Sequence, residues 1–334
     1  MKLKKMFFLM GLFALTCGGA YAANVDDNGL SDEDLRSVVG PELPKWDFLV
    51  RTYLEREDFD NGSPLIQGDN EDGLFWGVGL NAGLGKWNFD LTAERRWGGD
   101  WNSPDFDTMR VDYKVRYQVM DGLGVHLKYR SENRDRDYDK PSWYNSATRD
   151  RVELGTDFDL FNGYLSGWLV GGHDEDKYDK IDPLTGQVNG SGRDHGNYWE
   201  GDFGPTFKIT DRISIKPTLY TTGEYYESYR MTEEQLRLMA TFKLNDRVSL
   251  IPRIRITLDK NLRNKPNTDV GYDIDFGERI RYELLSDIKV TDKINAFVGL
   301  AYDDQERKLV DSVGKTEGKS INMWWWIAQL SYSF

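Results

Sequence analysis

The last eleven residues of the chain read WWWIAQLSYSF, from Trp324 to Phe334, and alternate positions separate them into two faces. Side chains on a β-strand point to opposite sides with a period of two. One face, formed by the even-numbered positions, carries only apolar and aromatic side chains. The other face ends in Gln329, Ser331 and Ser333. This pattern predicts a terminal strand with one apolar face and one face that becomes polar towards the chain end.

The same alternation recurs along the chain from residue 46 onwards. The run MRVDYKVRYQV, residues 109–119, shows it most clearly, because its odd positions are apolar or aromatic and its even positions are all charged or polar. Similar segments lie at 46–55, 87–97, 152–160, 213–219, 236–244, 248–258, 272–290 and 294–302, with weaker alternation at 164–171 and 198–208. The chain is therefore predicted to be all-β.

The connections between these segments fall into two classes. Short turns are expected at 85–86, 121–122, 162–163, 210–211, 245–246 and 291–292. Long polar connections are expected at 56–72, 98–106, 131–147, 172–196, 223–232, 260–270 and 304–318. Strict alternation of the two classes predicts a transmembrane antiparallel up-and-down β-barrel of about fourteen strands, with short periplasmic turns and long extracellular loops. Stacked β-sandwiches would not separate short from long connections in this way.

Barrel closure follows from the cost of an open edge. Within hydrocarbon, each backbone N–H or C=O group without a partner costs several kcal/mol. The last strand is therefore predicted to pair with the first, Trp46 to Glu55, and the apolar face of the last strand is predicted to meet lipid.

The N-terminus predicts the compartment. Residues 1–22 combine three lysines, an apolar run from Met6 to Leu15 and small residues ending in Ala22, which is the layout of a secretory signal peptide. Lipidation at Cys17, the only cysteine, is the alternative, but Thr16 before it fits that motif poorly. Cleavage after Ala22 would remove Cys17, and with it any disulfide or thiol site.

Residues 23–44 are predicted to form a periplasmic N-terminal extension, and residues 45–334 the barrel. The extension carries a possible helix start at Ser31 and a stop at Gly40. Two interpretations stay open, a disordered tail and a helix that enters the lumen.

Charge excludes one class of partner. The chain has 43 basic and 56 acidic residues, and removal of the signal peptide leaves 40 basic residues against the same 56 acids, a formal charge of −16. A chain this acidic is not expected to bind nucleic acid. No apolar run approaches the roughly 20 residues that a transmembrane helix needs.

A fourteen-strand barrel is wide enough to leave an open lumen. The predicted pore-lining residues are Arg110, Lys114, Arg116, Lys128, Arg130, Arg237, Arg253, Arg255, Arg279, Arg281, Asp90, Glu94 and Glu153. Because the fourth and eleventh of fourteen strands lie opposite one another, two basic patches are expected to face each other across the pore. Two interpretations follow, a lumen kept polar by ion pairs between neighbouring strands and a dedicated track for anions or acidic sugars.

A barrel enzyme and an adhesin are the rival classes. His173 beside Asp174, and His195 beside Asp194, lie in the longest predicted loop. Nothing in the sequence orients a base or nucleophile there, so no catalytic residue is predicted. A calcium site is also not predicted, because the loop glycine and final glutamate of an EF-hand are missing around Asp174, Asp176, Asp179 and Asp182. No metal or cofactor is expected.

Two segments carry a resemblance to a known family. WEGDFGPTFKITDRISIKP, residues 199–217, and the ending QLSYSF, residues 329–334, together with the strand count, resemble the monomeric outer membrane porin G (OmpG) family over nearly all of 45–334. The KdgM-type oligosaccharide porins are more distantly similar. Phe334, Tyr332 and Leu330 also resemble the C-terminal signal that the barrel assembly machinery recognises in outer-membrane barrels.

The resemblance implies a function and a location. It implies a monomeric porin in the outer membrane of a Gram-negative bacterium, in contact with outer-membrane lipid and lipopolysaccharide. Its water-filled channel would pass ions and small hydrophilic solutes, including oligosaccharides, by passive diffusion.

Overall fold

A computed structural model of the chain describes residues 46–59, 73–100, 103–136, 146–181, 187–264, 273–310 and 316–334. The predicted signal peptide, 1–22, and the predicted extension, 23–44, lie outside these residues. Among the described residues, no helix is long and apolar enough to cross a membrane. The secondary structure of this part of the chain consists entirely of antiparallel strands and turns.

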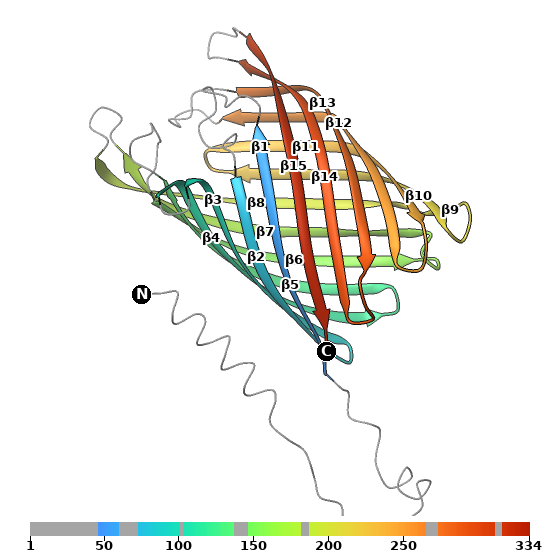
Figure 1. Cartoon of the computed structure of the whole chain (residues 1–334). Coiled ribbons are helices and arrows are strands. Elements are labelled where there is room, and N and C mark those ends of the chain that lie inside the picture. The colour runs from blue at the N-terminus through green and yellow to red at the C-terminus, as the bar shows by residue number, and fades with distance from the viewer. Residues whose placement is uncertain are drawn as a thin grey trace, which may run out of the picture. The chain divides into compact units, whose positions relative to one another are not determined.

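The strands form one continuous sheet, shown in Figure 1. They are β1 (Trp46–Phe59), β2 (Gly73–Leu84), β3 (Trp87–Asp100), β4 (Ser103–Met120), β5 (Leu123–Arg136), β6 (Ser146–Leu160), β7 (Leu165–Ile181), β8 (Val188–Pro205), β9 (Phe207–Lys208), β10 (Ile213–Tyr226), β11 (Tyr229–Lys243), β12 (Val248–Asn264), β13 (Asp273–Lys289), β14 (Ile294–Val310) and β15 (Thr316–Ser333). The two-residue β9 continues β8 beyond Thr206, and both pair with β10. The sheet is therefore a barrel of fourteen strands.

The first and last strands close the barrel. β1 pairs with β15 in a register that runs from Leu49 opposite Ser333 to Phe59 opposite Met323. The backbone N–H of Phe334 also donates to the C=O of Phe48 at 3.0 Å. In Figure 1 the blue β1 accordingly lies beside the red β15. Closure by the terminal strands, predicted from the cost of an open edge, is confirmed.

Part of the outward face of the strands forms an apolar band. Exposed side chains include Leu127, Leu154 and Leu284, each more than half accessible. Aromatic side chains gather towards the strand ends, as at Trp87, which begins β3, and Tyr225, near the end of β10. An apolar band bordered by aromatic residues is the outer surface of a transmembrane barrel. The last strand follows its predicted faces, because the even-numbered Trp324, Leu330, Tyr332 and Phe334 are exposed and the odd-numbered Met323, Trp325 and Ser331 are buried.

Inward side chains also form one apolar cluster. Leu285, Ala301, Met323 and Trp325 pack together on the inner side of β13 to β15. The Trp325 indole Nε1 donates to Glu55 Oε1 on β1 at 2.6 Å, so the cluster also links the two closing strands.

The six predicted short turns are present, and three contain a glycine in the left-handed region. Gly85, Gly122 and Gly163 have φ angles of 58°, 74° and 84°. A side chain at Gly122 would also place its Cβ only 2.1 Å from the Asp159 carbonyl oxygen, so glycine is required there by space as well as by conformation.

The predicted bounds of the long connections are wrong. The strands are mostly 14–18 residues long and extend deep into the segments expected to be loops. The connection expected at 223–232 is only Glu227 and Ser228, and most of the segment 172–196 belongs to β7 and β8. A strand needs only about 9–11 residues to cross the hydrocarbon. Beyond that depth the outward face has no need to be apolar, so the alternation fades while the strand continues.

The histidines at 173 and 195 are therefore not loop residues. His173 and Asp174 lie on β7, and Asp194 and His195 lie on β8. Asp176 and Asp179, which also fall within the long connection expected at 172–196, likewise lie on β7. Asp182 lies outside the described residues.

We predict that deletion of Phe334 reduces the amount of folded barrel recovered from cells severalfold and leaves the temperature at which the folded barrel unfolds almost unchanged. Phe334 contributes one terminal backbone hydrogen bond and an exposed ring, so its loss has little effect on the finished wall. Heat-modifiable gel mobility measures the folded fraction. Phe161→Ser, which removes another exposed phenylalanine at a short turn, is the control. Equal recovery of the deletion and the control would contradict an assembly role.

Candidate functional site: the charged inner wall

The alternation that exposes apolar residues on the outside turns the intervening side chains towards the barrel interior. The thirteen side chains predicted to line a pore all take this inner side. They lie on β3 (Asp90, Glu94), β4 (Arg110, Lys114, Arg116), β5 (Lys128, Arg130), β6 (Glu153), β11 (Arg237), β12 (Arg253, Arg255) and β13 (Arg279, Arg281). In the ring of fourteen strands, β4 and β12 are seven positions apart, so the two sets of basic residues lie on opposite walls.

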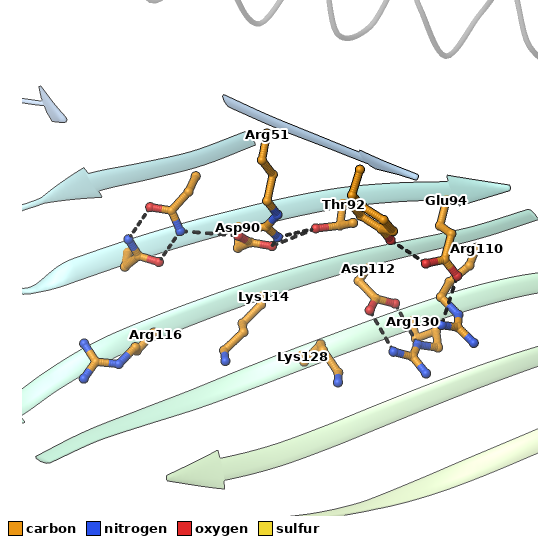
Figure 2. Close-up of a pocket in the computed structure, with 13 residues that line it drawn as sticks. Arg51, Asp90, Thr92, Glu94, Arg110, Asp112, Lys114, Arg116, Lys128 and Arg130 are labelled. Carbon is orange, nitrogen blue, oxygen red and sulfur yellow. Dashed lines mark hydrogen bonds and ion pairs between the residues drawn. The ribbon is translucent and has the colours of Figure 1, made fainter. Parts of the chain in front are cut away.

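A hollow of about 510 Å³ opens in the wall formed by β1 to β5, shown in Figure 2. Its lining residues are Arg51, Tyr53, Asn81, Asn88, Asp90, Thr92, Glu94, Arg110, Asp112, Lys114, Arg116, Lys128 and Arg130. Among the described residues of this lining, Tyr53 is the only aromatic one, and none is Ala, Val, Leu, Ile or Met. The hollow therefore offers hydrogen-bond donors and acceptors on almost every side.

Ion pairs between neighbouring strands hold most of these groups in place. Arg130 forms a bidentate ion pair with Asp112, with Nε–Oδ1 and Nη2–Oδ2 distances of 2.7 and 2.9 Å. Arg110 Nε lies 2.8 Å from Glu132 Oε2 and its Nη1 lies 3.2 Å from Glu94 Oε1. These paired contacts fix the direction of each guanidinium, because the planar fork of arginine matches a carboxylate.

Two further contacts of the same kind border the hollow. Arg51 Nη2 lies 3.0 Å from Asp90 Oδ1 and donates to Thr92 Oγ1 at 2.7 Å. Arg116 reaches across β5 to Asp157, with an Nη2–Oδ2 distance of 2.5 Å. Lys128 pairs with Glu153. Five of the six described cations of the lining thus have a carboxylate partner.

Glu153 is the acid that joins β5, β6 and β8 on this wall. Its side chain is buried, and it accepts from Lys128 Nζ at 2.7 Å and from the Tyr198 hydroxyl at 2.5 Å. His126 Nε2 lies 3.2 Å from the same carboxylate. The three partners hold this buried carboxylate in one position on the wall.

The opposite wall has an excess of positive charge around one acid. Glu283 on β13 is fully buried and contacts three guanidiniums, those of Arg253, Arg255 and Arg281. The distances from Glu283 Oε1 are 2.8 Å to Arg255 Nη2 and 2.9 Å to Arg281 Nε. Three cations share this one anion, and Arg281 Nη1 also lies 3.9 Å from Asp303 Oδ2, an acid that Arg279 shares, so the cluster keeps an excess of positive charge.

The other basic residues of this wall are balanced by acids. Arg279 Nη2 lies 2.7 Å from Asp303 Oδ2, and Arg237 Nη1 lies 2.6 Å from Asp202 Oδ2. Most of the predicted basic residues are thus members of ion pairs, and among the described residues of this wall the positive excess lies around Glu283.

The two histidine and aspartate pairs do not form a catalytic arrangement. His173 and His195 project from the outward face of β7 and β8, with ring centroids 6.0 Å apart. Their neighbours are Asn197, at 3.0 Å from His173 Nδ1, and Glu227, at 3.3 Å from His195 Nε2. Asp174 points inward and pairs with Arg151, on the other side of the strand. Among the described residues, no group of three or more potential metal ligands is found.

Sequence reasoning missed several residues of the inner wall, including the acid that organises one side of it. Glu283 shares the inward phase of Arg279 and Arg281, and Glu132 shares that of Lys128 and Arg130, so the period of two contains both. The partners of each arginine depend on the register between strands, which single-strand patterns do not contain.

Comparison with known proteins agrees on the fold. No protein-family description and no curated protein matches the chain in sequence. Among solved structures, the CymD monoaromatic hydrocarbon channel is similar with a TM-score of 0.50 and 8% identity, over 87% of this chain and 89% of that one. The fold is that of the outer-membrane β-barrels.

Other barrels align with lower scores. OmpT, an outer membrane protein of Vibrio cholerae, has a TM-score of 0.44 and 13% identity, over 88% of this chain and all of that one. The translocator domain of the autotransporter NalP from Neisseria meningitidis has a TM-score of 0.41 and 12% identity, over 99% and 96% of the two chains. At such identities the likeness concerns the fold alone.

We predict that Glu283→Gln lowers the free energy of unfolding by about 2–4 kcal/mol, because three part-buried guanidiniums lose their shared counter-charge. The temperature at which the protein loses its folded, faster-migrating form on a detergent gel will measure the change. Glu175→Gln is the control, since Glu175 is an exposed acid near Lys177 and Arg193 and should cost about 0.5 kcal/mol or less. Equal shifts for the two variants would contradict the organising role of Glu283.

Proposed function

We propose that the protein is an outer-membrane channel that lets ions and small hydrophilic solutes diffuse across the membrane. The observation that carries this proposal is the inner wall, where charged and polar side chains continue around a closed fourteen-strand barrel whose outer surface is apolar. Contact with water stabilises such a wall, because even paired ions carry a desolvation cost when they are removed from water. A barrel of this strand number has room for that water.

More specifically, we propose a monomeric, OmpG-like porin of a Gram-negative bacterium. The protein would reach the outer membrane after export to the periplasm. The C-terminal Leu330, Tyr332 and Phe334, the short turns at one end and the polar lumen support it. Its proposed partners are outer-membrane lipid, lipopolysaccharide and the barrel assembly machinery. The wall contacts are made of ion pairs rather than of a nucleophile and an oriented base, which favours transport over catalysis. Oligosaccharides belong to the proposed solutes because the lining is rich in hydrogen-bonding groups.

The proposal is tested by conductance. The purified and refolded protein is expected to migrate faster before boiling than after boiling on a detergent gel, and to produce discrete current steps in a planar bilayer. Polyethylene glycols of increasing size should stop reducing the current above a defined radius, because they no longer enter the lumen. A folded barrel that gives no current would contradict the channel and favour an enzyme or an adhesin.

Ion selectivity depends on the excess charge around Glu283. The overall charge of the chain favours cations, but charges farther away than the Debye length, about 8 Å at physiological salt, are screened. We expect the double variant Arg253→Gln, Arg255→Gln to shift the zero-current potential in a salt gradient towards cation preference, because it leaves Glu283 paired with Arg281 alone. Arg193→Gln, on an outward and exposed side chain, is the control. An unchanged potential in the double variant would show that these arginines do not act on permeant ions.

A further inference from the structure

Lys114, half-buried in the hollow of β1 to β5, is the one cation of that lining that forms no ion pair with a described residue. Figure 2 shows it between Arg116 and Lys128, with no interaction drawn to it. The other five cations of the hollow each contact a carboxylate. The lack of a carboxylate partner is therefore specific to Lys114, and the residues around it explain this lack.

The strand register places Lys114 in a single row across the wall. From β2 to β6 the directly opposite residues are Asn81, Asp90, Lys114, Lys128 and Glu153. Two lysines thus stand opposite each other, an arrangement that is destabilising unless an anion compensates it. The acids at each side of the two lysines are the first candidates for that role.

Both acids are already engaged. Asp90 Oδ1 accepts from Arg51 and Thr92 at 3.0 Å each, and its Oδ2 accepts from Asn81 at 3.3 Å. At the other end of the row, Glu153 Oε2 accepts from Lys128 at 2.7 Å. The ammonium group of Lys114 therefore faces the hollow with its hydrogen-bond donors available to a solute.

The rest of the hollow determines what kind of solute fits. Asn81 and Asn88 exchange two amide hydrogen bonds, of 2.8 and 2.7 Å, and together offer further donor and acceptor positions. Asp112 and Arg130 add an ion pair, and among the described residues that line the hollow every side chain carries a polar group. A volume of about 510 Å³ is within the range of small-molecule sites.

We propose that this hollow binds a small organic acid rich in hydroxyl groups, with its carboxylate at Lys114 and Lys128 and its hydroxyls towards Asn81, Asn88 and Asp112. The inference deepens the proposed channel function by naming a solute class that is retained on the wall during passage. A charge-assisted hydrogen bond to the carboxylate supplies affinity, and the amide and acid groups supply selectivity for hydroxyls.

Direct binding tests the inference without requiring current. Calorimetric titration of the refolded barrel uses three probes, namely gluconate, sorbitol, which lacks the charge, and butyrate, which lacks the hydroxyls. Gluconate should bind at least about tenfold more tightly than either of the other two, because only gluconate satisfies both parts of the hollow. Butyrate binding as tightly as gluconate would overturn the hydroxyl requirement, and absence of gluconate binding would overturn the site.

Two variants locate the site. Lys114→Met should weaken gluconate binding about tenfold or more, because it removes the available ammonium. Lys216→Met is the matched control, since Lys216 is another half-buried lysine of inward phase, on β10 and outside the hollow. Gel mobility before boiling verifies that both variants fold. Unchanged binding in Lys114→Met would overturn the proposal.

Bilayer recording separates this inference from the channel itself. A barrel that conducts but does not bind gluconate would contradict the site alone. A barrel that binds gluconate through Lys114 but carries no current would contradict the channel alone and leave the site in place.

Discussion

The pairing of backbone groups inside hydrocarbon is the constraint from which the architecture follows. Because no water is available there, every N–H and C=O must find a partner within the protein, and a sheet satisfies this only by closing on itself. β1 and β15 meet that demand, with Phe334 adding its own backbone bond to Phe48. Closure in turn divides the side chains between lipid and lumen, so alternate residues of each strand contact lipid outside and water inside.

The lumen side has its own constraint, which is the placement of charge. Many ionised groups face a confined space, and cross-strand ion pairs keep them apart and oriented. Where each cation has its own acid, as Arg130 has Asp112, the local net charge of the wall is zero. Two places depart from balance on opposite walls, the arginines around Glu283 and the single ammonium of Lys114. The proposals on selectivity and on solute binding come from these two departures.

The sequence allows the fold class, the strand number and the inward or outward phase of most strands to be predicted, because the solvent on each side selects every second residue. Closure by Trp46–Phe59 and the terminal strand was likewise predictable from the cost of an open edge. The strand ends were not, since polar strands such as β7 continue beyond the membrane without apolar residues to mark them. The carboxylate partner of Arg253, and the lack of one for Lys114 among the described residues, were not predictable either, because both depend on register.

The most direct test of the account is a disulfide across the closing strands. Thr52 and Leu330 are directly opposite on β1 and β15, while Thr52 and Tyr332 are two residues out of register. In a chain with Cys17 removed, the pair Thr52→Cys, Leu330→Cys should form a disulfide readily in isolated outer membranes, because opposite Cα atoms lie within about 4.4–6.8 Å. The pair Thr52→Cys, Tyr332→Cys should form little. The cross-linked barrel should conduct as the reduced one does. Equal linking of both pairs, or none in the matched pair, would contradict closure by these strands.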